Sequence, residues 1–275
     1  MKNQSQFPDF IYGTAWKEEA TASLTQKAIH SGFRAIDTAN QKKHYREDFV
    51  GEALLELARQ GIQRESLFLQ TKFTYVQGQD HRLPYDPADT FNKQVLSSFA
   101  SSLKNLNTHY VDSYLLHGPS TWDQLEDADW EVWETLEDLY RSGQTKAIGV
   151  SNFSINQLNE LFLKAKIKPM TVQNRCFANQ GWDKGVREFC RENNIVYQGF
   201  SLLTANPQVV TSSVVKTIAG RMNVTPQQVV FRFAKHIGIL PLTGTTQEMH
   251  MKEDLSSLQL ELNAEDVRAI GSLYS

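Results

Sequence analysis

The stretch 10–16, FIYGTAW, is a short apolar run that could begin either of two parallel α/β folds. A doubly wound open sheet carries a glycine-rich turn after its first strand, where the backbone approaches a dinucleotide phosphate. Here the run continues as Gly13-Thr14-Ala15-Trp16-Lys17, which is not such a turn. The first strand therefore favours a closed barrel, provided that enough strands follow it.

Seven more runs of this kind follow, each rich in β-branched or aromatic residues and each separated from the next by a longer amphipathic segment. They are RAIDTA (34–39), LFLQTKF (67–73), VDSYLLHG (111–118), TKAIGVSN (145–152), MTVQNRC (170–176), IVYQGFSLL (195–203) and GILPLTG (238–244). Eight β-then-α units in one chain predict an α/β fold, a single (β/α)8 TIM barrel domain over residues 1–275. The open doubly wound sheet is the alternative.

The segments between the runs carry helix signals. Apolar residues at three- and four-residue spacing, or cap residues, predict helices over 129–141, 155–165, 182–193 and 263–273. Ser154 suits an N-cap, and Thr225-Pro226 suits an N-cap followed by proline at the first helical position. Glycines that suit positions just past a helix end are Gly32, Gly61 and Gly143.

Bulk properties exclude several classes of function. The chain has 28 Lys and Arg against 31 Asp and Glu, a formal charge of −3, so no basic footprint suggests nucleic acid. Cys176 and Cys190 lack metal-ligand spacing, and few cysteines suit a reducing compartment. No apolar run is long enough to span a bilayer. We expect a cytoplasmic protein without nucleic-acid, membrane or metal partners, and its oligomeric state stays open.

Polar or aromatic residues stand at the end of almost every run. They are Trp16, Asp37, Lys72, His117, Ser151-Asn152, Gln173, Phe200-Ser201 and Thr243. In a TIM barrel the carboxyl ends of the strands carry the active site. Asp37, Lys72 and His117 end three successive runs, so they converge on one rim. A buried Lys–Asp pair is costly unless it is well hydrogen-bonded or used, and the pattern predicts a site there.

The segment 36–48, IDTANQKKHYRED, follows the second run and lies over that rim. We expect Tyr45 to hang toward Lys72 and His117. A phenol has an ordinary pKa of about 10, and a neighbouring ammonium group should lower that pKa. Asp37 can hold the lysine, and His117 can donate a hydrogen bond to a carbonyl oxygen. This constellation suits protonation of an oxygen on which negative charge develops.

Several motifs in order now identify a resemblance. They are Gly13-Thr14, Asp37-Thr38-Ala39, Val50-Gly51, Thr71-Lys72, Leu115-Leu116-His117, Gly149-Val150-Ser151-Asn152-Phe153 and Gln173. Together they resemble the aldo-keto reductase superfamily over almost the whole chain. The resemblance implies that Asp37, Tyr45, Lys72 and His117 are catalytic, with Tyr45 as general acid. It implies hydride transfer from a nicotinamide to an aldehyde or ketone.

The resemblance also implies a cofactor site and a substrate pocket. The implied cofactor-binding residues are Gly13, Thr14, Asp37, Ser151, Asn152, Gln173, Phe200, Ser201, Leu203, Thr243, Gly244, Thr245, His250, Glu253 and Asp254. The implied substrate pocket is formed by Trp16, Tyr45, His117 and Gly118. NADPH is the expected cofactor because it is the family's usual one, with NADH or dual use as the alternative. The expected substrate is a small carbonyl compound.

The chain departs from the family pattern in three places. Counting back from Val50-Gly51 without gaps puts His44 rather than Tyr45 in the tyrosine's position. Gly118 replaces the usual tryptophan, which predicts a wider pocket. Leu242 and His250 replace the usual lysine and arginine that hold the 2′-phosphate of NADP. Two other functions stay open: a nucleotide-binding regulatory subunit on the same barrel, and an aldolase or isomerase that uses Lys72 as a Schiff base.

Overall fold

The computed structural model describes residues 7–274 and has eight parallel strands closed into a barrel. The strands are β1 (Ile11–Gly13), β2 (Ala35–Asp37), β3 (Phe68–Phe73), β4 (Ser113–Leu116), β5 (Ile148–Ser151), β6 (Thr171–Arg175), β7 (Val196–Phe200) and β8 (Leu240–Thr243). Tyr12 of β1 is in register with Ile36 of β2 on one side and with Thr243 of β8 on the other, which closes the barrel. The predicted fold class is confirmed.

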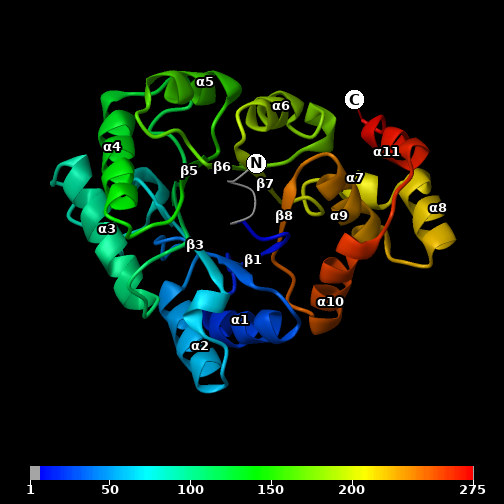
Figure 1. Ribbon diagram of the computed structural model, residues 1–275, viewed down its shortest axis with the longest axis horizontal. Helices are drawn as coiled ribbons and strands as arrows, with labels where there is room; N and C mark the ends of the chain where they lie inside the picture. Colours follow the sequence, from blue (N-terminus) through cyan, green and yellow to red (C-terminus); the bar gives the residue numbers. More distant parts are fainter. Residues whose placement is uncertain (1–6, 275) are drawn as a thin grey trace.

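Helices surround the barrel on all sides, as the view in Figure 1 shows. They are α1 (Thr21–His30), α2 (Glu47–Arg59), α3 (Phe91–Asn105), α4 (Asp127–Arg141), α5 (Ile155–Lys164), α6 (Lys184–Glu192), α7 (Pro207–Val210), α8 (Ser213–Met222), α9 (Pro226–His236), α10 (Glu248–Ser256) and α11 (Ala264–Gly271). No helix within residues 7–274 combines the length and apolar character that crossing a membrane requires.

The predicted helix ends agree closely with the structure. Helices α4, α5, α6 and α11 match the four predicted segments to within two residues at each end. Ser154 and Thr225 both accept a hydrogen bond from the third residue of their helices, as N-caps do. Gly32, Gly61 and Gly143 all have positive φ angles just past a helix, where a residue without Cβ is favoured.

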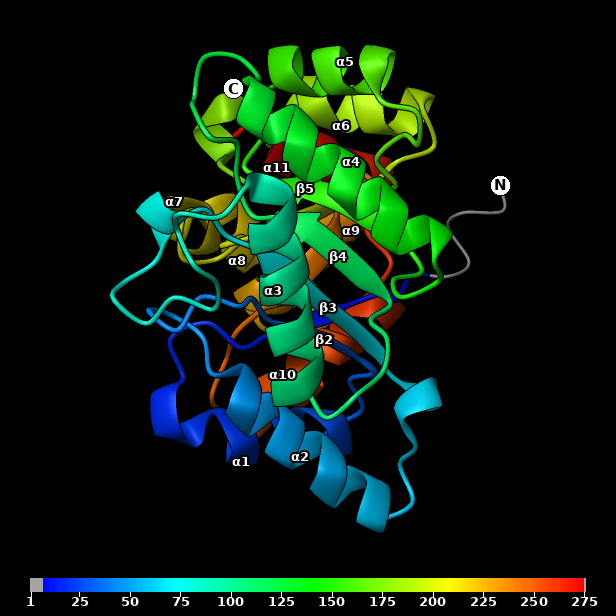
Figure 2. The same ribbon diagram turned by 90° about the vertical axis from the view of Figure 1, so that its left-hand side faces the viewer.

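The polar strand ends gather at one end of the barrel. In Figure 2 the long segments that follow β3 and β4 lie together at the left, beyond the same ends of their strands. Parallel register aligns Asp37 with Gln70, and it aligns Ser151 with Gln173. The same ends of neighbouring strands therefore lie side by side. The opposite end is filled by a small apolar cluster that includes Ile11 and Leu240.

Candidate active site

A buried ion pair lies at the centre of the strand ends. The Lys72 Nζ atom donates to both carboxylate oxygens of Asp37 at 2.6 and 2.7 Å, and to the carbonyl of Thr38 at 2.9 Å. Lys72 is fully buried and Asp37 is 3% exposed. Burial lowers the pKa of Lys72, and the negative charge of Asp37 opposes that shift. With its amine enclosed in this way, Lys72 is poorly placed to form a Schiff base with a substrate.

Three glutamines form a buried amide layer beside this ion pair. Gln70 and Gln173 both donate to Asp37 Oδ1, at 2.7 and 3.1 Å. Both also donate to the side-chain oxygen of Gln198, and Gln198 donates back to Gln70. Satisfied networks of this kind hold a buried charge in one position. Asp37 is therefore fixed by neutral amides as well as by Lys72.

Tyr45 lies beside the ion pair and His117. Its ring centroid is 5.5 Å from Lys72 Nζ and 5.9 Å from the centroid of the His117 ring. Within residues 7–274 its hydroxyl has no hydrogen-bond partner, so it is free to meet a ligand. Asp37, Tyr45, Lys72 and His117, called the central cluster below, are thus brought together as predicted.

The pKa of Tyr45 differs from the prediction. Lys72 was expected to lower it, but burial and the negative charge of Asp37 raise it above the ordinary value of 10.0. The physical reason is that burial disfavours the charged phenolate, and the nearby Asp37 carboxylate adds to this effect. Tyr45 therefore keeps its proton at neutral pH.

His117 is held as a neutral imidazole. Its Nδ1 atom lies 2.7 Å from the Thr74 hydroxyl. Burial and then the positive charge of Lys72 place the pKa of His117 well below 6.5. The neutral ring can offer one N–H group toward the cavity and accept from Thr74 at the other nitrogen.

His44 occupies a different place from its neighbour Tyr45. Its ring lies against Trp16 with centroids 3.8 Å apart, and its Nδ1 atom lies 2.9 Å from the side-chain oxygen of Gln41. Burial and the charge of Lys43 lower its pKa. His44 thus lines the outer wall of the cavity with Trp16, while Tyr45 faces the central cluster.

A cavity of about 800 Å³ opens above the central cluster. Most of the predicted cofactor and substrate residues line it: Gly13, Trp16, Asp37, Tyr45, His117, Ser151, Asn152, Gln173, Phe200, Ser201, Leu203, Thr243, Gly244 and Thr245. Trp16, Asn152 and Ser201 have φ angles of 60°, 60° and 58°. Non-glycine residues in this left-handed conformation concentrate at functional sites. The volume of the cavity lies within the usual range for small-molecule pockets.

Besides the buried Lys72, five residues predicted to bind cofactor or substrate lie outside the lining of this cavity. Thr14 is buried, and both its hydroxyl and its N–H donate to the Asp37 carbonyl. Gly118 lies near Asn152, with ordinary contact distances around the position of a side chain. The remaining three, His250, Glu253 and Asp254, belong to α10. Asp254 is buried beside β8, which raises its pKa to about 7.

Sequence reasoning missed two cations in the lining, Lys17 and Arg175. Lys17 donates to the carbonyl of Gly244, and burial lowers its pKa to about 8. Arg175 is exposed at the end of β6, with its guanidinium carbon 5.6 Å from the centroid of the Phe200 ring. Arg175 lies two residues after Gln173, a strand spacing that places both on one face and could have revealed it.

Sequence reasoning also missed Glu47, the first residue of α2. Its buried carboxylate accepts hydrogen bonds from Thr71 at 2.5 Å, Ser102 at 3.1 Å and Asn105 at 3.4 Å. Burial raises its pKa to about 7. These bonds tie the segment that carries Tyr45 to β3 and α3.

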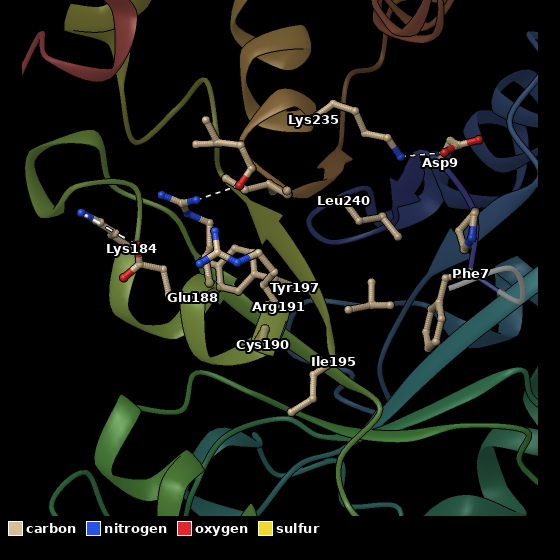
Figure 3. A pocket seen from close by; sticks show the side chains of 16 residues that line it. Phe7, Asp9, Lys184, Glu188, Cys190, Arg191, Ile195, Tyr197, Lys235 and Leu240 are labelled. Atoms are coloured by element: carbon tan, nitrogen blue, oxygen red, sulfur yellow. Dashed lines mark hydrogen bonds and ion pairs between the residues drawn. The ribbon is translucent and has the colours of Figure 1, made fainter. Parts of the chain in front are cut away.

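A second cavity, of about 430 Å³, lies between α6, the end of α9 and the beginnings of β7 and β8 (Figure 3). Lys235 pairs with Asp9 at 2.6 Å across it, and Lys184 reaches Glu188 at 3.9 Å. Its cysteine, Cys190, is buried, and burial raises the pKa of the thiol above its ordinary value. The charged groups are thus largely paired, and the cavity offers no proton-transfer cluster comparable to the central one within the described part of the chain.

Comparison with known proteins gives one consistent result. Residues 10–275 match the model of the aldo/keto reductase family. The chain is 33% identical to a glyoxal reductase from Bacillus subtilis, covering 93% of this chain and 83% of that protein. It is 32% identical to an NADPH-dependent codeinone reductase from Papaver somniferum, covering 90% and 78%. A crystal structure of an aldo/keto reductase from Brucella melitensis superimposes with a TM-score of 0.83, at 27% identity, covering 97% and 95%.

Proposed function

The chain belongs to the aldo/keto reductase family, and from this premise we propose that it reduces aldehydes or ketones to alcohols, with Tyr45 as the proton donor. The family uses a nicotinamide cofactor, which supplies the hydride when bound. NADPH is the cofactor we propose, since the codeinone reductase relative is NADPH-dependent. The observation that carries the proposal is the unpartnered hydroxyl of Tyr45, whose ring lies 5.5 Å from Lys72 Nζ and 5.9 Å from the His117 ring at a ligand-sized cavity.

Each residue of the central cluster has a separate role in protonating the substrate. His117 Nδ1 shares a hydrogen bond with the Thr74 hydroxyl, and in the tautomer in which Thr74 donates, the other ring nitrogen can donate to the substrate carbonyl. Tyr45 keeps its proton until negative charge develops on that oxygen, because an alkoxide is a stronger base than a phenolate. Lys72, whose Nζ atom lies 5.5 Å from the centroid of the Tyr45 ring, then helps to stabilise the phenolate, and Asp37 holds Lys72 in place. Prearranged groups of this kind lower the barrier because they need not reorganise.

The residues around the cluster fit a nicotinamide dinucleotide. The amide nitrogen of Gln173 is used inward on Asp37 and Gln198, so its amide oxygen remains for a carboxamide. Phe200 offers an aromatic face at the cavity wall. On the other side, Lys17 and the hydroxyl groups of Thr245 and Thr246 offer donors for phosphate oxygens.

A fluorescence titration tests the proposal directly. NADPH and NADH are titrated separately against the protein, and a nitrobenzaldehyde is then added to the same cuvette. We expect binding of NADPH followed by its oxidation. Binding without oxidation across a broad panel of carbonyl compounds would contradict the reductase and support the regulatory-subunit alternative. Absence of binding by either nucleotide would contradict both.

A further inference from the structure

Two cations in the proposed active-site cavity lack a carboxylate partner. Lys17 donates only to the Gly244 carbonyl, and Arg175 packs over the Phe200 ring. Within residues 7–274 neither forms an ion pair, and Asp37, the only carboxylate of the cavity lining, is neutralised by Lys72. A cleft lined by one sign of charge concentrates ligands of the opposite sign. The cavity is therefore built for an anionic ligand on more than one side.

Arg175 has a defined place in this cavity. It is the last residue of β6, in register with Phe200 of β7, and it shares a strand face with Gln173. Two strand residues rise about 7 Å, so Arg175 stands above the wall from which Gln173 reaches Asp37. Its guanidinium lies within cation–π range of the Phe200 ring, and its planar edge can form two parallel hydrogen bonds to an anion.

We propose that Arg175 binds an anionic oxygen group of the ligand that fills this cavity. The inference rests on the proposed function and adds a residue and a ligand chemistry to it. Carboxylate and phosphate both match the bidentate geometry of a guanidinium. Such a group has two sources here, the pyrophosphate of the dinucleotide or a carboxylate or phosphate on the carbonyl substrate. An experiment with two readouts separates them.

The experiment compares Arg175→Met with the wild-type protein. The first readout is the Kd of NADPH by fluorescence titration. The second is the ratio of kcat/KM for 4-carboxybenzaldehyde to that for benzaldehyde, at saturating NADPH. Loss of a charge-assisted hydrogen bond should change an affinity by about tenfold. A tenfold fall in the ratio assigns the anion to the substrate, and a tenfold rise in Kd with an unchanged ratio assigns it to the cofactor.

Two further variants make the result specific. Arg175→Lys keeps the charge without the planar fork, so it should recover part of whichever effect is seen. Arg59→Met removes an exposed arginine from α2, far from the cavity lining, and controls for net charge. Either effect should shrink as salt rises, because exposed charges are screened.

Two results overturn the inference: Arg175→Met changes neither the Kd nor the ratio by more than about twofold, the range of context effects on an exposed charge, or Arg59→Met changes them as much as Arg175→Met does. These results differ from failure of the proposed function. If the wild-type protein oxidises NADPH with neither aldehyde, the reductase proposal fails, and the NADPH titration still tests Arg175.

Discussion

The segment 242–254 is called the adenosine end below. It differs from the central cluster in how its side chains are fixed in place. Lys72 is fully buried, and its partner Asp37 accepts hydrogen bonds from Lys72, Gln70 and Gln173. At the adenosine end, Gly244 and His250 are exposed, and the ion pair Lys252–Glu248 runs along the surface of α10. The central cluster is fixed by buried networks, whereas the adenosine end is largely exposed to solvent apart from Thr243, Met251 and Asp254.

The difference follows from what each region is proposed to do. Proton transfer needs donor and acceptor in near-attack geometry, where an error of about 1 Å can cost a hundredfold in rate. Side chains on closed-barrel strands with satisfied partners meet that need. Phosphate affinity can be supplied by any nearby cation or N–H group, so surface residues there can change more freely. Mutation should therefore have large effects at the central cluster and graded effects at the adenosine end.

The largest effect is expected for Tyr45→Phe. Removing the proposed proton donor should lower kcat by about a thousandfold, since general acids contribute between 10² and 10⁴. The Kd of NADPH should change little, because the ring remains. His44→Ala is the matched control, since it alters the neighbouring residue that packs on Trp16. Steady-state kinetics and nucleotide titration check both variants, and a large loss in His44→Ala with retention in Tyr45→Phe would reverse the assignment.

An intermediate effect is expected on stability from Glu47, which anchors the Tyr45 segment. Its pKa rises on folding from 4.5 to about 7. The folded state thus holds a proton that the unfolded chain releases, so this contribution to stability is full below pH 4.5 and is lost as pH rises to about 7. The free energy of unfolding of Glu47→Gln, relative to that of the wild type, should therefore rise by about 3 kcal/mol between pH 4.5 and 8.

Urea unfolding at several pH values measures this difference. Glu52→Gln, on the exposed side of the same helix, is the control, and its difference from wild type should show no such window. A stability difference for Glu47→Gln that stays constant from pH 4.5 to 8 would show that Glu47 is ionised in the folded protein at the same pH as in the unfolded chain. The hydrogen bonds from Thr71, Ser102 and Asn105 would then stabilise the charged carboxylate of Glu47 enough to offset its burial.

The sequence predicted the fold and the central cluster for one physical reason. A closed parallel barrel brings every strand end to one face, so polar residues that end apolar runs must meet. The sequence left His44 and Tyr45 open, because the segment between Asp37 and Val50 has no internal periodicity. The structure separates them, since Tyr45 turns toward Lys72 while His44 turns toward Gln41.

Residues inside the runs were harder to predict than residues at their ends. Gln70 and Gln198 lie two positions before Lys72 and Phe200, on the same strand faces, yet an amide within an apolar run gives little signal of a shared network. Lys17 carried no signal at all, because its importance depends on the Gly244 carbonyl, far away in sequence. Sequence periodicity could not predict side-chain contacts between segments that are distant in sequence, whether these contacts lie inside the barrel or in a loop.

The smallest effect is expected at the adenosine end, from the double variant with Leu242→Lys and His250→Arg. Both positions lie on or next to the segment that offers Thr245 and Thr246 to a phosphate. Two added cations should tighten NADPH by about tenfold, one charge-assisted bond, and should leave NADH nearly unchanged because it lacks the 2′-phosphate. Met249→Arg adds a positive charge at an exposed position of the same helix, and it shows how much of the effect comes from net charge alone. Titration of both nucleotides measures the two Kd values. An equal fall in the Kd of NADPH and of NADH would mean that the added charges do not contact the 2′-phosphate and act only by making the cavity more positive, as Lys17 and Arg175 already do.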